Sequence, residues 1–310
     1  MLLANVTVRS VERPSPSFAR IELGGPQLAD FGVDGPLFDQ RIKLVFPGPQ
    51  GLPALSAENW WSDYTSLEAE TRGAVRTYTI ADVAGAGAET RIVVDFVIHP
   101  GAHGPGSDWA QQASPGDELL AVLPRRGTVG GGIEFEPGDA ERLLLVGDET
   151  ALPAIHQILR ELPERAGGRT GAVFVEVPCA EDICDLPVVD GVEVTWLPRG
   201  ERAVGAPMME SVAAHLGFAP MPAAAESAAV EPADAAPPSA DDMPWETPTY
   251  SALGEAAEEV APPVDGRYAW IAGEAGMVTA LRRHLVGELG MPRTQVAFMG
   301  YWRQGVAMRA

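Results

Sequence analysis

The sequence predicts two domains of different class, an all-β antiparallel domain followed by a doubly wound parallel α/β domain. Residues 1–138 are rich in short segments containing Val and Ile, separated by Pro, Gly and Asp turns. Residues 139–310 instead alternate continuous apolar runs with segments of helical periodicity. A chain of 310 residues is long enough for each domain to bury its own core.

Six short strands are expected in the first domain, which favours a small antiparallel β-barrel. The fourth, "VRTYTIADV" at residues 75–83, alternates small or β-branched residues with Arg76 and Tyr78. Residues 47–73 are too long for a hairpin and predict a functional or lid-like loop. The expected strands are residues 2–12, 18–25, 40–48, 75–83, 91–99 and 117–123.

The second domain begins with a short buried strand, "RLLLVG", followed by a helical pattern at residues 151–162. Three further apolar strands and a long helix at residues 274–289, closed by Gly290, lead to a last strand, "QVAFMGYW". Such alternation is typical of a parallel sheet covered by helices on both faces.

Residues 219–265 fit neither domain. They contain ten acidic residues, no Lys or Arg, and many Ala and Pro. This composition cannot bury enough apolar area to offset the entropy of ordering, so we expect a disordered surface insertion. A tolerated solvated loop and a partner-binding segment around Trp245 and Tyr250 remain open as its role.

The net charge of −21 shows no basic footprint for nucleic acid. No apolar run approaches the length of a membrane span, and no signal peptide is evident, so we expect a cytoplasmic protein without membrane insertion. We expect a monomer or a weak dimer. Cys179 and Cys184 alone cannot build a zinc or iron–sulfur site, so no metal site is expected; incidental thiols and a redox disulfide remain open.

The fourth strand and the turn before the expected helix at Trp109 carry groups that suit a flat phosphorylated ligand. Arg76 and Tyr78 share one strand face and suit a diphosphate and an aromatic ring, while Thr79 offers a hydroxyl from the other face. "GPGSDW" at residues 104–109 predicts a Gly-rich approach to a helix N-terminus, which favours an anion. A surface strand with a cation–π pair and an ordinary helix cap explain the same patterns.

Two further segments follow strands of the second domain. "GDET" at residues 147–150 lies at the carboxyl edge of the sheet, where open α/β sheets bind ligands. It lacks the G-x-G-x-x-G fingerprint and carries two carboxylates, so a helix cap remains an alternative. The aromatic pair in "GYWRQG" at residues 300–305 either belongs to the core or covers a flat ligand.

In this order, "RTYTI", "VDFVIH", "GPGSDWA", "LLLVGDETALPAI", "WIAGEAGMVTALRRHL" and "GYWRQG" resemble segments of the siderophore-interacting protein family, a flavin-dependent branch of the ferredoxin reductase-like superfamily. The resemblance covers nearly the whole chain outside residues 219–265. It implies an FAD-binding β-barrel followed by a nicotinamide-binding α/β domain. It also implies reduction of a ferric siderophore, with FAD as cofactor and NADPH or NADH as electron donor.

The resemblance assigns roles only at matching positions. Arg76 would clamp phosphate, Tyr78 would stack on the flavin ring and Thr79 would bond a ring atom. Asp148 and Thr150 would border the place where nicotinamide meets flavin. The other implied cofactor-binding residues are Asp95, Val97 and His99 beside the ribityl chain and ring, and Gly106, Ser107 and Trp109 at the pyrophosphate.

Three departures from the family pattern bear on these roles. The family often reads R-x-Y-T-x-R, and the last Arg is here Ala81. The usual G-P-A-S is here G-P-G-S, and the G-P-R-G stretch is here "LPRRG", which leaves Arg125 and Arg126 without a clear role. Anionic siderophores would favour a basic mouth, for which the candidates are Lys43, Arg125, Arg126 and Arg303.

The leading hypothesis is an FAD-dependent ferric-siderophore reductase in which the cofactor carries the redox chemistry, so no catalytic side chain is required. A flavin-dependent reductase with another acceptor, or with a donor such as ferredoxin, is a rival within the same class. A non-catalytic siderophore- or flavin-binding protein is a rival of a different class.

Overall fold

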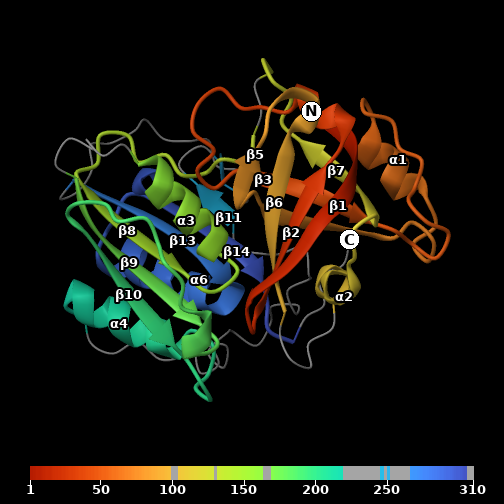
Figure 1. Ribbon diagram of the computed structural model, residues 1–310. Coiled ribbons are helices and arrows are strands. Elements are labelled where there is room, and N and C mark those ends of the chain that lie inside the picture. The colour runs from red at the N-terminus through yellow and green to blue at the C-terminus, as the bar shows by residue number, and fades with distance from the viewer. Residues whose placement is uncertain are drawn as a thin grey trace. The chain divides into compact units, whose positions relative to one another are not determined.

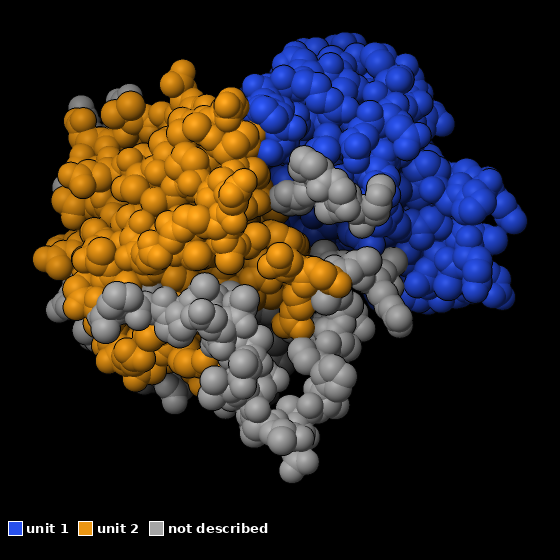
Figure 2. Space-filling view, turned by 90° about the horizontal axis from the view of Figure 1, so that it is seen from below, with its two compact units in different colours: residues 1–133, 310 blue, residues 134–309 orange. Residues whose placement is uncertain are grey.

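The computed structural model divides the chain into two compact units, residues 1–133 and residues 134–309 (Figure 2). It describes residues 1–98, 104–128, 131–162, 169–218, 245–247, 250–251 and 266–305. Within these ranges, no helix is long and apolar enough to cross a membrane.

The first unit is an antiparallel sheet of seven strands in the order β4-β3-β7-β1-β2-β6-β5 (Figure 1). Alternate strand residues such as Val6, Ile21 and Phe96 are fully buried and form its core. The expected barrel is confirmed as a half-barrel, since β4 and β5 are edge strands that do not pair with each other. The strands are β1 (Leu2–Ser15), β2 (Phe18–Gly24), β3 (Arg41–Phe46), β4 (Ala74–Thr79), β5 (Asp82–Ala84), β6 (Arg91–Val97) and β7 (Glu118–Leu123).

The expected fourth strand is divided into β4 and β5, which gives seven strands instead of six. At the break the chain changes partner, because the Ile80 amide donates to Gln40 while the Ala81 amide donates to Val93. The two edge strands are therefore consecutive in the chain, and β4 also approaches β6. The sheet curls at this point because β4 and β5 are consecutive in the chain, although the two strands are not hydrogen-bonded to each other.

The long segment between β3 and β4 is packed against the outer face of the sheet. It contains the short helix α1 (Trp60–Ser66), whose Tyr64 is fully buried with Val45, Val75 and Leu120. The Tyr64 hydroxyl donates to the Gly73 carbonyl, and the Arg72 guanidinium lies 4.6 Å from the centroid of the Tyr64 ring. The expected lid-like loop is therefore anchored by an aromatic residue.

A second helix of this unit, α2 (Pro105–Gln112), contacts β2, β3, β4 and β6. It is joined to β1 because the Arg13 guanidinium donates to the Ala110 and Gln111 carbonyls at 3.0 and 3.1 Å. A cation at these last carbonyls satisfies them and complements the negative end of the helix dipole. Short 3-10 turns, η1 (Pro26–Asp30) and η2 (Gly87–Glu89), complete the unit.

The second unit contains a sheet in the order β10-β9-β8-β13-β14-β11-β12. Its first five strands are parallel, and the order reverses between β8 and β13, as in a doubly wound fold. The two-residue β12 and three-residue β11 add an antiparallel ribbon to β14. The strands are β8 (Arg142–Gly147), β9 (Thr170–Val177), β10 (Val192–Pro198), β11 (Trp245–Thr247), β12 (Tyr250–Ser251), β13 (Arg267–Glu274) and β14 (Val296–Trp302).

Helices pack on both faces of this sheet, as right-handed crossovers in opposite directions require (Figure 1). The helices α4 (Ala206–Leu216) and α6 (Ala275–Arg282) share one core with Leu144, Val146 and Ile271. The helix α3 (Leu152–Glu161) has its own fully buried row, which includes Ile155 and Ile158. A π-helical turn (Arg283–Glu288) continues α6, and 3-10 turns lie at Ala180–Asp182 (η3) and Arg293–Gln295.

Within the stretch expected to be a disordered insertion, residues 219–265, the structure describes β11 and β12. The antiparallel pairing of Trp245 with Met299 and of Glu246 with Phe298 attaches β11 to the sheet. The other residues of this stretch lie outside the described part of the chain.

Candidate functional site

The edge strand β4 places the first three candidate residues. Its register with β3 pairs Tyr78 with Ile42 and Arg76 with Leu44, so both candidates lie on the face that carries the core. Thr79 pairs with Arg41 and therefore lies on the opposite face. The structure agrees with the expectation that Arg76 and Tyr78 share a face and Thr79 does not.

Tyr78 belongs to an aromatic cluster that joins β4 to α2. Its ring centroid lies 4.5 Å from that of Phe96 and 6.3 Å from that of Phe46. Trp109 of α2 completes the cluster, 5.4 Å from Phe46 and 5.7 Å from Phe96. Burial raises the pKa of Tyr78 well above its ordinary value, so the hydroxyl keeps its proton and the ring stays neutral.

Gly106 is required where Tyr78 meets the first turn of α2. A Cβ atom at Gly106 would lie 1.9 Å from the Tyr78 hydroxyl oxygen, so a residue larger than glycine would overlap the tyrosine. The tyrosine thereby lies directly against the amino end of the helix. This contact brings an aromatic ring and a helix N-terminus together within one unit.

The N-cap residue of α2 is Gly104, which has no side chain with which to cap the helix. Amide groups of a first helical turn attract anions through their hydrogen atoms and the helix dipole. Ser107 lies in this first turn, and Asp108 is the acidic residue beside it. The donors suit a phosphate, with Asp108 as the opposing charge.

Arg76 supplies a cation on the same face as Tyr78. One guanidinium nitrogen donates to the Val75 carbonyl at 2.7 Å. Partial burial lowers the pKa of Arg76. An anion at this position would replace the hydrogen bonds and charge stabilisation that water provides to an exposed guanidinium. The guanidinium, the aromatic ring and the helix N-terminus together fit a phosphorylated flavin such as FAD.

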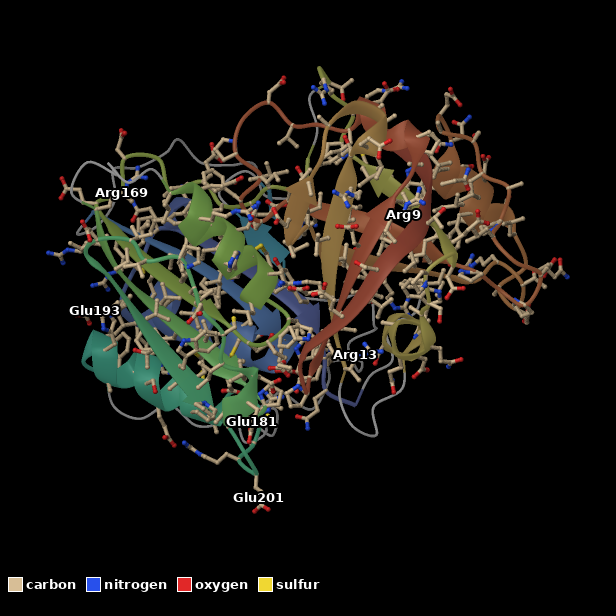
Figure 3. All side chains as sticks on the ribbon, in the orientation of Figure 1. Arg9, Arg13, Arg169, Glu181, Glu193 and Glu201 are labelled. Atoms are coloured by element: carbon tan, nitrogen blue, oxygen red, sulfur yellow. The ribbon has the colours of Figure 1, made fainter. Side chains whose placement is uncertain are left out.

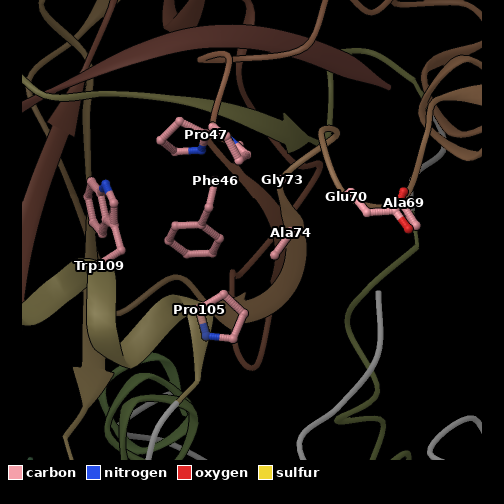
Figure 4. A pocket seen from close by; sticks show the side chains of 10 residues that line it. Phe46, Pro47, Ala69, Glu70, Gly73, Ala74, Pro105 and Trp109 are labelled. Carbon is pink, nitrogen blue, oxygen red and sulfur yellow. The ribbon is translucent and has the colours of Figure 1, made fainter.

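A pocket of about 320 Å³ lies beside Ala74, the first residue of β4 (Figure 4). Its floor is Phe46, flanked by Pro105 and Trp109 of α2 and by Ala74 of β4. Ala74, Arg76 and Tyr78 alternate along one face of β4, so the pocket continues the row that carries the two candidates. Its rim also includes Glu70, Gly73 and the turn at residues 47–49.

Asp95 and Val97 lie on β6, on the face opposite Phe96. The Asp95 carboxylate accepts hydrogen bonds from Nε and Nη2 of Arg20, each at 2.8 Å, across the β2–β6 ladder. The structure therefore does not bring these two side chains together with Tyr78, which contacts Phe96 on the core face. His99 lies outside the described residues.

The candidate basic residues for a substrate are distributed over both units. The Lys43 ammonium donates to the Thr77 hydroxyl at 3.0 Å, and burial, followed by the Arg41 charge, lowers the pKa of Lys43. Arg125 forms an exposed pair with Asp30, and Arg126 donates to the Phe31 carbonyl, so both hold the turn at residues 30–32. Arg303 follows β14 in the second unit.

In the second unit, Asp148 is the centre of the carboxyl edge of the sheet. It lies after β8, next to the point where the strand order reverses. One carboxylate oxygen accepts the Thr150 amide and hydroxyl at 2.9 and 2.5 Å. The other accepts the Glu274 amide and the Trp302 indole N–H, both at 2.7 Å. Asp148 thus fastens the ends of β8, β13 and β14.

Asp148 is fully buried, and its surroundings shift the pKa of its carboxyl group. Burial is the main effect that raises the pKa of Asp148, to about 6, and the Glu149 charge adds to it. The hydrogen bonds from Thr150 and Trp302 act in the opposite direction. Gly273, with φ of 139°, passes so close that a Cβ atom would lie 2.6 Å from the carboxylate. No other residue type fits beside Asp148 at that position.

A second buried network lies at the ends of β8, β9 and β10. The Arg199 guanidinium binds both Glu149 carboxylate oxygens, at 2.5 and 2.7 Å, and one Glu176 oxygen at 3.4 Å. Glu176 also accepts the Gly205 and Met208 amides at the start of α4. Burial raises the pKa of Glu176 to about 7. Two fully buried carboxylates therefore depend on one arginine.

Sequence reasoning proposed Asp148 and Thr150 as site residues, which stays a prediction, and it did not single out the buried Glu176, Arg199 and Glu274 at the same edge. Glu274 caps α6 by accepting the Met277 amide at 3.0 Å, and it also accepts the Gln304 amide. A signal was present, because "AVFVEV" and "WIAGE" each place a charged residue at the end of an apolar strand. A charge in that position needs a buried partner, and the partner is not identifiable from the sequence alone.

Two family matches divide the chain in the same way as the two units. The family described as siderophore-interacting FAD-binding domain matches residues 7–128, and the family described as siderophore-interacting protein matches residues 140–305. The expected cofactor, FAD, is confirmed by the first match, while the expected domain bounds stay a prediction. The roles of the individual site residues stay predictions.

Proteins from several bacteria are similar in sequence to this chain. The NADPH-dependent ferric-chelate reductase of Escherichia coli is 34% identical over 215 residues, 65% of this chain and 73% of that protein. The ferric vibriobactin reductase of Vibrio cholerae is 26% identical over 94% of this chain and 86% of that protein. An uncharacterized protein of Mycobacterium tuberculosis is 36% identical over 61% of this chain, and the match spans only 62% of that relative's length.

Solved structures share the whole architecture. A siderophore utilization protein from T. fusca superposes with a TM-score of 0.67 at 27% identity, over 99% of this chain and 94% of that one. A ferredoxin NADP+ reductase from Neisseria gonorrhoeae, 11% identical with a TM-score of 0.56, has the same fold over 97% of this chain and 100% of that one. With family matches over both units, this chain belongs to the siderophore-interacting protein family.

Proposed function

We propose that this protein is an FAD-dependent oxidoreductase that uses NADH or NADPH to reduce ferric iron held in a siderophore. One observation carries the proposal: a tyrosine ring lies against the first turn of a helix with a glycine N-cap, and a partly buried guanidinium lies on the same strand face as that ring, within the unit that matches an FAD-binding domain. The printed names of the E. coli and V. cholerae relatives support the reaction class.

FAD, when bound, supplies the redox chemistry: it accepts a hydride from the nicotinamide and passes electrons singly to the iron. Arg76 and the first turn of α2, with Gly106 and Ser107, would hold the negative charge of the pyrophosphate. Tyr78 would provide an aromatic surface for the flat ring system, and the Thr79 hydroxyl would provide a hydrogen-bond donor to it. Trp109 and Phe46 keep Tyr78 in place through their ring contacts.

Asp95, Val97 and His99 are proposed to flank the ribityl chain and ring. Because the Asp95 carboxylate already pairs with Arg20, its contribution in this role is to hold the strand that presents the backbone of Val97. In the second unit, Thr150 and Asp148 form a hydrogen-bonded turn at the switch point of the sheet, where a nicotinamide dinucleotide is proposed to bind.

The substrate is proposed to be an anionic ferric siderophore, drawn to the basic groups Lys43, Arg125, Arg126 and Arg303 against the acidic background of the chain. Reduction releases the iron because Fe(II) carries less charge and binds hard oxygen ligands more weakly than Fe(III). A reaction that consumes NADH or NADPH accords with the cytoplasmic location expected from the sequence. A monomer or weak dimer remains the proposed assembly.

The colour of the flavin tests the reaction. Purified protein supplied with FAD is expected to be yellow, to bleach anaerobically with NADH or NADPH, and to regain colour when a ferric siderophore is added. Bleaching without recovery would favour another electron acceptor. A flavin that never bleaches with a nicotinamide would favour a ferredoxin donor or a non-catalytic binding protein.

Substitution of the proposed flavin contacts tests the site separately. Arg76→Ala and Tyr78→Ala should each raise the dissociation constant for FAD by on the order of tenfold or more, because each removes a charged or stacking contact worth at least about 1.4 kcal/mol. Arg91→Ala is the matched control, since Arg91 lies on β6 in an exposed pair with Glu22. Full FAD occupancy in both test variants would exclude Arg76 and Tyr78 from the site.

A further inference from the structure

The chain contains a single lysine, Lys43, which lies on the outer face of the half-barrel. Its neighbours on β3, Ile42 and Leu44, belong to the core, so the Lys43 side chain lies on the opposite face of the strand. Lys43 is half-buried there, whereas Arg9 and Arg13 of β1 are exposed (Figure 3). The lysine is therefore held within a regular sheet and is only partly in contact with water.

The residues around the Lys43 ammonium give it no opposite charge. Directly opposite in the two ladders lie Thr77 of β4 and Val122 of β7, and on the same face of β3 lie Arg41 and Val45. The Thr77 hydroxyl accepts a hydrogen bond from the ammonium at 3.0 Å. No carboxylate of the described residues forms an ion pair with Lys43, and Arg41 carries the same charge as the ammonium.

These surroundings favour the neutral amine of Lys43 over its ammonium form. Partial burial and a nearby like charge both disfavour a cation. Both act in the same direction here, since burial first and the Arg41 charge second lower the pKa of Lys43. A neutral amine has a free electron pair and is a nucleophile, whereas an ammonium group is not. Lys43 is therefore more reactive toward electrophiles than a lysine in water.

From this arrangement we infer that Lys43 is a site of covalent acylation by small activated acyl donors, either an acyl phosphate or an acyl thioester. The Lys43 nitrogen attacks the carbonyl carbon of the donor with its electron pair, and a nitrogen–carbon bond forms. The bond from that carbon to the phosphate oxygen or to the thiol sulfur breaks, and phosphate or thiolate leaves with the electron pair. The nitrogen loses a proton to water, so the product is a neutral amide.

Acylation of Lys43 would change the charge of the proposed substrate site and not that of the proposed flavin site. Lys43 is one of the four basic groups proposed to attract an anionic siderophore, and the amide is neutral. Arg76 and Tyr78, the proposed flavin contacts, lie on the core face of β4. This consequence rests on the proposed function, whereas the reactivity of Lys43 does not, and the two are tested separately.

Mass spectrometry after brief exposure to acetyl phosphate or to acetyl-CoA measures the reaction. The α-amino group of Met1, an exposed residue, is the internal reference. The ratio of Lys43 to Met1 acetylation should be higher in the folded protein than in guanidinium chloride by on the order of threefold or more, because folding increases the fraction of neutral amine. Reaction with one donor alone supports the inference and identifies the donor class. An equal or lower ratio in the folded protein overturns it.

Substitution of the neighbouring cation tests the physical cause. Arg41→Gln removes the like charge and should lower the acetylation ratio of the folded protein by about twofold or more. Arg91→Gln is the matched control, since Arg91 lies on β6 in an exposed pair with Glu22, and it should leave the ratio unchanged. An unchanged ratio in a folded Arg41→Gln variant, checked by circular dichroism, also overturns the inference. If that variant does not fold, the comparison of folded and unfolded wild type decides.

Discussion

The two units concentrate charge in opposite ways. In the half-barrel, Arg76 and the amino end of α2 present positive charge and N–H groups beside the aromatic row of Tyr78, Phe46 and Trp109. At the carboxyl edge of the α/β sheet lie four buried carboxylates, Asp148, Glu149, Glu176 and Glu274. Glu149 and Glu176 bind the Arg199 guanidinium, whereas Asp148 and Glu274 accept hydrogen bonds from backbone amides and other neutral donors. The first arrangement attracts an anion, whereas the second uses its charges to hold backbone amides and loops in place.

This difference has a physical consequence for how each unit could bind a nucleotide. A guanidinium and a helix N-terminus gain from an arriving phosphate, so ligand binding and stability reinforce each other. Carboxylates at the sheet edge are already hydrogen-bonded to groups of the protein, and they offer no counter-charge to an arriving phosphate.

The largest expected effect is on the acidic edge. Arg199→Met should lower the free energy of unfolding by about 3–5 kcal/mol, because the buried carboxylates of Glu149 and Glu176 would lose the guanidinium that binds both of them. Chemical denaturation measures the change. Arg202→Met is the matched control, since its exposed pair with Glu210 should contribute less than about 1 kcal/mol. Similar losses in both variants would contradict the dependence of the buried pair on Arg199.

The second prediction concerns pH and the same edge. Glu176 has a pKa of about 7 in the folded protein, above the ordinary value of 4.5 that applies when it is unfolded. The folded state therefore binds more protons between these two values, and stability falls as the pH rises from about 4.5 to 7. The fall attributable to Glu176 should be on the order of 3 kcal/mol.

Denaturation curves at a series of pH values, for wild type and Glu176→Gln, measure this contribution. The variant should lose the part of the slope between pH 4.5 and 7, while the slope from Asp148, whose pKa is about 6, remains. Glu210→Gln, at an exposed pair, is the control and should retain the full slope. An unchanged slope in Glu176→Gln would show that the glutamate is not the titrating group.

The smallest expected effect sharpens the description of the half-barrel. Gly106→Ala should destabilise the protein by about 1–3 kcal/mol, because the new methyl group would overlap the Tyr78 hydroxyl. Tyr78→Phe removes that oxygen, so the double variant should recover much of the loss. The coupling energy from a double-mutant cycle checks the contact. Additive effects would mean that the tyrosine does not lie against α2.

Local patterns were sufficient for most of the elements. Alternation predicted β1, β2, β3, β6 and β7 closely, because a half-buried strand needs only every second residue to be apolar. The division of residues 75–83 into β4 and β5 was missed. The chain changes hydrogen-bond partner at Ile80 and Ala81, and both residues are compatible with a continuous strand.

The candidate site, like the strands, was predicted only in part from the sequence. The shared face of Arg76 and Tyr78 follows from strand geometry alone, and the glycine at 106 was expected in an anion-binding turn. Its contact with Tyr78 was not, because the two residues lie on separate elements. The pairing of Asp95 with Arg20 likewise depends on the β2–β6 register, which no local pattern contains.

The order of residues along the chain is enough to establish two domains, an antiparallel one before a parallel α/β one, and the motifs that mark the family. Periodicity and short motifs are local properties, and they survive without knowledge of the folded state. Which charges neutralise one another was settled only by folding. Arg199 reaches Glu149 across 50 residues and Trp302 reaches Asp148 across 154. The order of the strands in the sheet determines which of these residues lie together. Burial then makes each pairing costly in free energy to break.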